Sequence, residues 1–396
     1  MLTVKTNYNV AAYVWPAYSG KEKRTNIFWP DGKGEWQTVC NASGKFEGHN
    51  WPRQPLLGTL DEADPETMEL YIDTATEHGV NVFIYDWYWY DRRPFLEQSL
   101  NEGFLKAKNN AKMKFYLMWA NHDAMHLWDI RNSHDEETCV WRGDVDRKEF
   151  EIIARRLIYT YFDHPCYYKI GGKPVFSIYD FGNLQKGLGG LEGVRDAFEW
   201  FRDECVRCGL PGVHLQMIVQ HPHVPDLSGV NGNACLLTPE DIVFLGVDSI
   251  THYQYLHFTD IDRSYPELLP DVENEWKTMA AQMPVPYFPH VSIGWDNNPR
   301  FKLFKPGILR ENTPENVYRA FLMAKQHIDS TLLPVPLITV NSWNEWTESS
   351  YLLPDDLYGY GYLEAVRDAF LEKETQPVSE TKKEPLHIGQ PEKLHA

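Results

Sequence analysis

The sequence predicts a single (β/α)8 TIM barrel with a long loop after its first strand. Eight apolar runs of strand length recur along the chain, and stretches with helical patterns separate them. Most of the runs are almost continuously hydrophobic, as parallel strands buried on both faces should be. Strands that alternate with helices form a parallel sheet, and eight such units close a barrel. One barrel domain can absorb the 396 residues of the chain.

The expected strands are apolar runs about as long as a typical strand. Because they repeat with helical stretches between them, we assign each run to one unit of the barrel. In chain order, the ranges are Val10–Trp15, Val80–Asp86, Met113–Trp119, Pro174–Tyr179, His214–Val219, Val247–His252, Pro286–Ile293 and Pro336–Val340.

Helix start and stop signals lie between these runs. Asp64-Pro65-Glu66 combines an N-cap residue, a proline at the first helical position and an acid in the first turn, and Gly79 then ends the helix. Thr313-Pro314-Glu315 repeats the start signal. Capped or amphipathic patterns predict further helices over Asp144–Phe162, Gly193–Cys208, Glu273–Gln282 and Thr313–Ser330.

Two segments depart from this regular alternation. About fifty residues separate the first strand from the first helix, far more than the usual short connection. Because this loop is rich in aromatic side chains, we expect it to form a wall or lid of a site; it holds Trp29, Trp36, His49, Trp51 and Arg53.

Residues 1–372 form the predicted barrel. Residues 373–396 are polar, rich in Lys, Glu and Pro, and are expected to be a flexible tail.

Composition excludes several classes of partner. A formal charge of −18 argues against nucleic acid and anionic membranes, and no apolar run approaches the length of a bilayer span.

The first residues lack a secretory pattern, so we expect a cytoplasmic protein, or a periplasmic or secreted one if a leader was trimmed. Six scattered cysteines fit a reducing compartment. Cys205 and Cys208 have no second pair to complete a zinc site, and we expect neither a metal nor a cofactor.

The run from Ile338 to Glu348 carries the most chemical information. An apolar, β-branched strand ends in two carboxylates, Glu345 and Glu348, set among Trp343, Asn344 and Trp346. Catalytic groups lie at such strand ends in α/β barrels, and a spacing of three residues points both carboxylates the same way. Two carboxylates that face one cavity are the minimum equipment for hydrolysing a glycosidic bond. The alternative is a surface helix with two solvated glutamates, which the flanking tryptophans disfavour.

In a barrel, the carboxyl ends of all eight strands share one space. Aromatic rings and hydrogen-bonding side chains occur at nearly every expected end, as a sugar site requires. A single histidine or tryptophan at a strand end more often has a structural role. Because such residues occur at nearly every expected strand end, the pattern favours a sugar-binding site. The candidate substrate-binding residues are Tyr13, Trp15, Asp86, Trp87, Trp119, Asn121, His122, His252, Tyr253, Trp295, Asp296, Trp343 and Asn344.

Asp86 is an acid at the end of an apolar strand, so it should be costly to bury without a partner. A sugar hydroxyl, an arginine such as Arg92, or a bracing role in the following loop would each satisfy it.

Several stretches resemble one known family. The chain is similar to the glycoside hydrolase family 99-like proteins, often called WbsX-type, which are relatives of the endo-α-mannosidases. The resemblance spans about residues 9–370, and its specific part is Asn344-Glu345-Trp346-Thr347-Glu348. The other matching stretches are Tyr13–Pro16, Gly48–Gly58, Tyr85–Trp89, Leu117–Asn121 and Tyr362–Ala365.

The resemblance implies a (β/α)8 barrel and a retaining mechanism without an ordinary carboxylate nucleophile. By position, Glu345 would deprotonate the 2-hydroxyl of the sugar, which attacks C1 to give a 1,2-anhydro sugar. Glu348 would protonate the leaving oxygen and then activate water. The sequence departs from the pattern at two places: Thr347 stands where the mannosidases have His, and His122-Asp123-Ala124 replaces the usual charged run. The first departure affects mannosidase specificity, and the second alters a wall of the pocket.

Three functions compete on these grounds. The first is a retaining glycoside hydrolase that acts on an α-linked oligosaccharide or polysaccharide. The second is a glycosyltransferase of polysaccharide assembly, of the O-antigen type, for which the chain offers neither a Gly-rich phosphate loop nor a D-x-D motif. The third is an inactive sugar-binding protein, which the presence of both glutamates disfavours. We therefore expect hydrolysis carried by Glu345 and Glu348.

Overall fold

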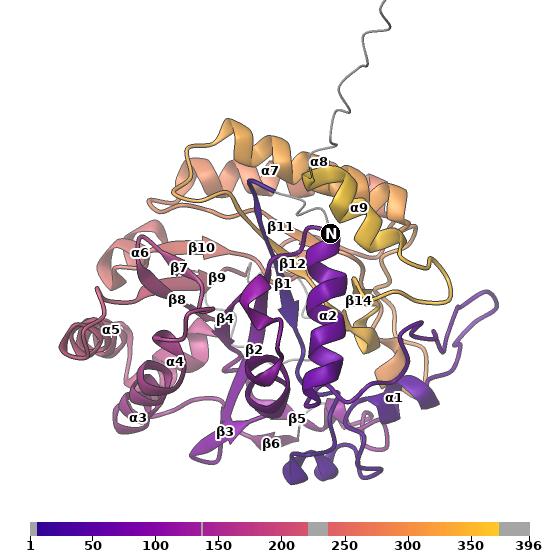
Figure 1. Cartoon of the computed structure of the whole chain (residues 1–396), viewed down its shortest axis with the longest axis horizontal. Helices are drawn as coiled ribbons and strands as arrows, with labels where there is room; N and C mark the ends of the chain where they lie inside the picture. Colours follow the sequence, from indigo (N-terminus) through magenta and orange to yellow (C-terminus); the bar gives the residue numbers. More distant parts are fainter. Residues whose placement is uncertain (1–5, 136–137, 221–236, 372–396) are drawn as a thin grey trace, which may run out of the picture.

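A computed structural model describes residues 6–135, 138–220 and 237–371. Its main sheet contains eight parallel strands in the order β10-β9-β8-β4-β2-β1-β12-β11. A parallel bridge between Ile250 and Tyr287 links the two ends of this order, so the sheet forms a nearly closed barrel with helices around it (Figure 1). The strands are β1 (Asn9–Val14), β2 (Val82–Tyr90), β4 (Lys114–Trp119), β8 (Lys173–Ile178), β9 (His214–Ile218), β10 (Ser249–Thr251), β11 (His290–Ser292) and β12 (Leu337–Asn341).

The predicted barrel is confirmed, and each expected strand overlaps one of these eight. Two bounds differ appreciably. β2 continues to Tyr90 because it pairs there with the antiparallel strand β3 (Arg93–Phe95). β11 is only three residues long, because the chain before His290 contributes a single bridge at Tyr287.

The helices follow the predicted order. The Asp64 side chain caps α2 by accepting from the Glu66 amide, as its N-cap signal predicts. α7 begins eight residues before the expected Glu273, at a capping box formed by Ser264 and Glu267. Pro270 lies inside this helix, and an internal proline normally marks a helix end. The α-helices are α1 (Trp36–Asn41), α2 (Pro65–Glu77), α3 (Arg147–Leu157), α4 (Phe181–Leu188), α5 (Leu191–Arg207), α6 (Pro239–Leu245), α7 (Tyr265–Gln282), α8 (Pro314–Ser330) and α9 (Gly361–Phe370).

Short elements lie at both ends of the strands. β3, β5, β6 and α1 lie at the carboxyl ends, in the lower part of Figure 1, whereas β7 pairs with the beginning of β8 at the other end. The short strands are β5 (Ala124–Met125), β6 (Cys139–Trp141), β7 (Lys169–Ile170), β13 (Asn344–Glu345) and β14 (Ser350–Tyr351). The single-turn helices are η1 (Lys23–Ile27), η2 (Ser99–Gly103), η3 (Phe104–Lys106), η4 (Asn110–Lys112), η5 (His126–Trp128), η6 (Ile158–Phe162), η7 (Tyr255–His257), η8 (Asn298–Arg300) and η9 (Trp346–Glu348).

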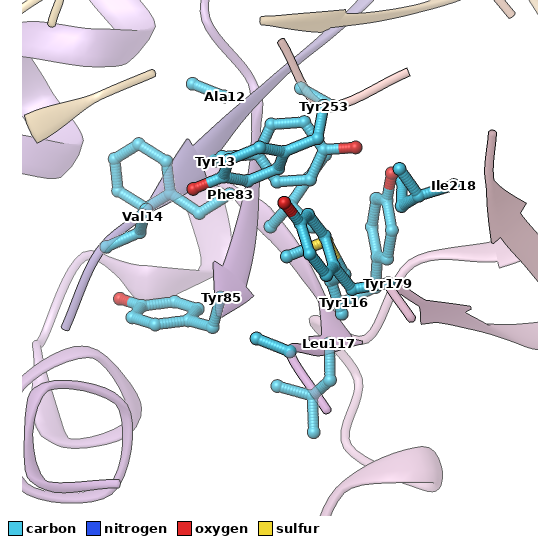
Figure 2. Packing of buried hydrophobic residues seen from close by; sticks show 14 of the residues in the cluster. Ala12, Tyr13, Val14, Phe83, Tyr85, Tyr116, Leu117, Tyr179, Ile218 and Tyr253 are labelled. Atoms are coloured by element: carbon cyan, nitrogen blue, oxygen red, sulfur yellow. The ribbon is translucent and has the colours of Figure 1, made fainter. Parts of the chain in front are cut away.

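Aromatic rings fill much of the barrel interior. Figure 2 shows Tyr13 of β1 beside Tyr253, and their ring centroids lie 4.7 Å apart. Tyr179 meets the Tyr253 ring edge-on at 5.3 Å. Buried polar groups here are paired with one another: Thr339 of β12 contacts both His290 and Thr251 through its hydroxyl, at 2.9 and 2.8 Å. This filled layer forms a rigid floor beneath the strand ends.

The long loop between β1 and α2 folds over the same end of the barrel and contains η1 and α1. Its Trp29 packs edge-on against Trp15, and the indole of Trp36 donates to the Leu60 carbonyl. The predicted tail, residues 373–396, lies outside the described residues. Across the described part of the chain, no helix is both long and apolar enough to cross a bilayer.

Candidate active site

Glu345 and Glu348 lie just beyond the end of β12, on a tightly tied turn. Glu345 belongs to β13, which pairs with β14, and Glu348 ends η9. The Ser342 hydroxyl organises this turn: it accepts from the amides of Asn344 (3.2 Å) and Glu345 (2.7 Å) and donates to the Ser350 carbonyl (2.6 Å). The backbone that carries the carboxylates is therefore fixed by hydrogen bonds.

Both carboxylates line one cavity at the carboxyl ends of the strands. Its volume is about 40 Å³, and the space among its lining side chains, including the part open to solvent, is about 460 Å³. Aromatic, polar and ionisable side chains surround it. The lining residues are Trp15, Asp86, Tyr88, Met118, Ala120, His122, Trp128, Tyr179, Tyr253, Gln254, Leu256, His257, Trp295, Arg300, Glu345 and Glu348.

A single buried arginine joins the two carboxylates. Arg300 Nη1 donates to Glu348 Oε1 over 2.5 Å, and Nη2 donates to Glu345 Oε2 over 3.3 Å. The Nε edge of the same guanidinium lies 3.5 Å from Glu35 Oε1. Glu35 comes from the long loop after β1 and also accepts from the Thr347 hydroxyl at 3.1 Å. The loop thus contributes a buried acid to the cluster around Arg300.

The charges of this cluster do not balance if every acid is ionised. Three buried carboxyl groups (Glu35, Glu345 and Glu348) share one guanidinium, and a fourth, Asp86, lines the same cavity. Burial raises the pKa of Glu345 well above its ordinary value, and the neighbouring Glu348 raises it further, whereas Arg300 opposes the shift. Burial also raises the pKa of Glu348, against the lowering effect of Arg300. The pair is therefore able to hold a proton near neutral pH.

Asp86 extends this network across the cavity. The Tyr253 hydroxyl lies 3.0 Å from Asp86 Oδ2 and 3.3 Å from Glu345 Oε1, so it can donate to either carboxylate. Burial raises the pKa of Asp86 well above its usual range. Arg92, one of the predicted partners of Asp86, instead lies 3.9 Å from Glu149 and is largely exposed.

On the cavity, two buried acid oxygens have no hydrogen-bond partner among the described residues, namely Asp86 Oδ1 and Glu348 Oε2. Leaving a buried acceptor unsatisfied is costly, so each oxygen offers a ready site for a hydroxyl donor. Both residues line the cavity. The arrangement therefore supplies what a polyhydroxylated ligand needs.

Aromatic rings and neutral histidines complete the walls. Trp15 packs against Trp128 at 5.3 Å between ring centroids, and both rings border the cavity. Burial lowers the pKa of His122 to about 4 and that of His257 to about 3, so both imidazoles are neutral near pH 7. Neutral imidazoles exchange hydrogen bonds with hydroxyls without adding charge.

The structure places seven of the fifteen predicted site residues on the cavity: Trp15, Asp86, His122, Tyr253, Trp295, Glu345 and Glu348. Four others support the site from behind. Asn344 links the backbone of Trp15 to the buried Glu62, and Asp296 accepts from His49. Tyr13 packs under Tyr253, and His252 contacts Tyr287.

The remaining four, Trp87, Trp119, Asn121 and Trp343, do not line the cavity. Trp87 turns away because successive side chains of a strand alternate: Asp86 and Tyr88 face the cavity, while the Trp87 indole donates to Glu97 outside it. Asn121 braces Asp180 through both its amide atoms. Trp343 packs against Phe83 and Tyr71.

Sequence reasoning missed several residues that line or brace the site. Tyr88 was detectable, because alternation from Asp86 predicts that it faces inward. Arg300 ends the single-turn helix η8 and Glu35 directly precedes the short helix α1, both inside long connections where no periodic pattern indicates which way a side chain points. The same is true of Trp128 and His257 in their single-turn helices.

No group of three or more His, Cys, Asp or Glu side chains with metal-binding geometry occurs in the part of the chain that the structure describes. Cys205 and Cys208 are both free thiols.

A (β/α)8 barrel that carries two carboxylates over a pocket at its carboxyl strand ends has the architecture of a large class of glycoside hydrolases. The chain belongs to the family described as Glycosyltransferase WbsX, whose sequence model matches residues 10–366. The glycoside hydrolase family 99-like relationship that the motifs indicated is confirmed.

The curated relatives carry no assigned activity. Two proteins called "Uncharacterized protein WxcX", from two strains of Xanthomonas campestris pv. campestris, are 29% identical over 355 residues. The match covers 87% of this chain and 47% of each relative, so the chain spans about half the length of these proteins.

Solved structures share the fold. The GH99 endo-α-mannosidase from Bacteroides thetaiotaomicron superimposes with a TM-score of 0.59 at 16% identity, over 92% of this chain and 97% of that one. A structure described as a glycoside hydrolase-like protein gives a TM-score of 0.55 at 17% identity, over 93% and 96% of the two chains. At these identities, the likeness establishes a glycoside hydrolase-type barrel.

Proposed function

We propose that this protein is a retaining glycoside hydrolase that cleaves an α-linked glycan with Glu345 and Glu348. The observation that carries the proposal is that both carboxylates border one cavity and share the guanidinium of Arg300. Aromatic walls and unpaired acid oxygens in the same cavity fit a sugar better than an apolar or an anionic ligand.

In the first half-reaction, Glu345 acts as the base. Its carboxylate removes the proton of the sugar 2-hydroxyl, and the resulting oxygen attacks C1 to form a 1,2-anhydro sugar. The bond from C1 to the leaving oxygen breaks, and Glu348 donates its proton to that oxygen. The raised pKa of Glu345 suits a base that must take a proton from a hydroxyl, since a more basic carboxylate is a better acceptor.

In the second half-reaction, the roles reverse. Glu348, now ionised, removes a proton from water, which attacks C1 and opens the three-membered ring. Glu345 returns its proton to O2. Two inversions at C1 give net retention. Glu348 offers Oε2 for these transfers, because Oε1 is held by Arg300 while Oε2 has no partner among the described residues.

A glycosyltransferase is the second candidate, because the family description carries that name. Such an enzyme must hold the diphosphate of a nucleotide sugar, which requires cations or a metal. Among the residues that the structure describes, Arg300 is the only cationic side chain that lines the cavity, and three carboxylates already surround it. The charge of the cavity therefore favours a neutral glycan over an activated anionic donor.

The deciding experiment is an activity screen with NMR detection. Purified protein is incubated with a panel of α-linked oligosaccharides, and the anomer released first is read before mutarotation. We expect cleavage with the α-product first, and loss of cleavage in Glu345→Gln and Glu348→Gln. Parallel reactions with nucleotide sugars and acceptor glycans test the alternative. Transfer from a nucleotide sugar without hydrolysis of any glycan would overturn the proposal.

A further inference from the structure

An apolar patch with basic neighbours lies on the loop that forms one wall of the cavity. Leu303, Phe304 and Phe46 are 80, 52 and 51% exposed, which is unusual for side chains of this type. Leu303 and Phe304 are consecutive, and the Phe304 ring meets Phe46 edge-on at 5.8 Å. We call these three residues the rim patch. Most other exposed apolar residues of the chain, such as Leu332 and Val243, belong to separate elements.

The rim patch stands on a rigid support. Asn298 closes the loop below Leu303 and Phe304 by accepting from the Lys305 amide (2.7 Å) and donating to the Lys305 carbonyl (2.9 Å). Asn298 also donates to Asp296 Oδ1 over 2.8 Å. On the other side, His49 holds the Phe46 turn, since it accepts from the Lys45 amide and contacts Asp296 Oδ2 at 2.7 Å.

Asp296 therefore anchors both halves of the rim patch, and the neighbouring Trp295 lines the cavity. The apolar side chains are held outward, beside the site, by buried hydrogen bonds. Nothing in the barrel requires three large apolar side chains to remain in water at this place, so their exposure calls for a partner.

Local charge identifies the chemistry of that partner. Segments 44–49 and 301–306 contain Lys45, Lys302 and Lys305 but only one acid, Glu47, whereas the whole chain has 38 basic and 56 acidic residues. Lysines that adjoin protruding apolar residues in the chain match a lipid interface, where the apolar groups enter the acyl boundary and the cations meet anionic headgroups. A glycan platform would need no excess of lysine and would make little use of a leucine.

We propose that the rim patch docks this protein onto an anionic lipid surface. The total charge of −18 led us to expect no affinity for such a surface, but it is a sum over the whole chain, and the two segments that carry the rim patch have three lysines and one acid. Docking in this way would turn the mouth of the cavity toward carbohydrate carried at the surface. The inference is independent of the proposed hydrolysis, because it concerns binding alone.

Vesicle co-sedimentation tests it. The full chain is mixed with phosphatidylcholine vesicles, with or without phosphatidylglycerol, at low salt. We expect sedimentation only with phosphatidylglycerol, and at least a tenfold weaker partition for Leu303→Ser combined with Phe304→Ser. Lys302→Glu should also weaken binding at low salt, and this loss should shrink as added salt screens the charges. The matched controls are Leu332→Ser, at a fully exposed leucine between α8 and β12, and Lys169→Glu in β7; both lie at the opposite end of the barrel and should bind as the wild type does.

Three results would overturn the proposal. The first is a wild-type chain that stays in the supernatant with phosphatidylglycerol vesicles. The second is a rim-patch variant that sediments as well as the Leu332→Ser control. The third is a concentration-dependent dimer, seen by light scattering, that the rim-patch substitutions dissociate while vesicle binding is absent; that result would assign the patch to self-association. Because the substituted side chains are exposed, equal melting temperatures of all variants verify that folding is unaffected.

Discussion

The guanidinium of Arg300 donates to Glu348 Oε1 across 2.5 Å and is itself almost completely buried. Burial alone would lower its pKa, but Glu348, Glu35 and Glu345 together raise it, so Arg300 is always charged. One fixed positive charge thus sets the electrostatic potential at both proposed catalytic groups. The protonation state of Glu345 and Glu348 therefore depends on the charge of Arg300.

Arg300→Gln should shift the activity profile toward higher pH. Arg300 lowers the pKa of both Glu345 and Glu348, so its removal raises both values. The acidic limb of the profile reports the ionisation of the base, and the alkaline limb reports the protonation of the acid. Both limbs should therefore move to higher pH. The kcat/KM profile over pH measures this. The exposed Arg310→Gln is the matched control. A rate that falls with both limbs unmoved would assign Arg300 a purely structural role.

Glu348→Gln should lower turnover on a natural glycan by about two orders of magnitude or more, on the scale of lost general acid catalysis. Glycosides with an activated leaving group, such as 4-nitrophenol, should lose less, because that group departs without a proton. Steady-state kinetics on both substrates tests this, with exposed Glu364→Gln as control. Near-normal activity of Glu348→Gln on the natural glycan would contradict the assignment.

Asp86→Ala should leave the fold intact and weaken sugar binding at least about tenfold, which is about 1.4 kcal/mol. The reason is that Asp86 Oδ1 is buried on the cavity and has no partner among the residues that the structure describes, while Oδ2 accepts from Tyr253. Isothermal titration calorimetry with the reaction product or an inhibitor measures the affinity. Unchanged affinity removes Asp86 from the site, and a collapsed melting temperature identifies it instead as a structural brace.

Glu62→Gln should make stability less dependent on pH. Glu62 is buried behind Asn344, and burial raises its pKa from 4.5 to about 8. The folded state therefore holds a proton that the unfolded chain releases. Stability falls as pH rises from about 4.5 to about 8 and is constant above that range, with a slope of up to about 1.4 kcal/mol per pH unit.

Denaturant unfolding at pH 5, 7 and 9 (round values that span this window) compares the wild type with Glu62→Gln and with the exposed Glu77→Gln. The Glu62 variant should lose less stability between the extremes than either of the other two proteins. Three parallel curves would show that Glu62 does not titrate in this range.

Activity should survive chelation. The proposed chemistry uses two carboxylates and needs no Lewis acid, and none of the described residues forms a metal-binding cluster. Turnover measured after dialysis against EDTA should equal that of the untreated enzyme. Loss of activity that a divalent ion restores would count against the two-carboxylate mechanism and in favour of a transferase.

The sequence by itself determined the barrel, the order of its strands and the position of the carboxylate pair. Strands buried on both faces leave continuous apolar runs, and helix starts leave capping signals at Asp64 and Thr313. These features are local, so they can be read without knowing the contacts. Glu345 and Glu348 could be identified from the sequence for the same reason, because they follow such an apolar run within a few residues.

Only the tertiary structure decided which side chains reach the cavity. Asp86 and Trp87 lie where the parallel pairing of β2 with β4 ends, and Trp119 ends β4, yet the cavity receives Asp86 and excludes both tryptophans. Arg300 and Glu35 lie more than 250 residues apart in sequence, and they meet because two irregular loops fold over the same end of the barrel. A side chain in an irregular loop takes its direction from long-range packing and hydrogen bonds, and these exist only once the chain has folded.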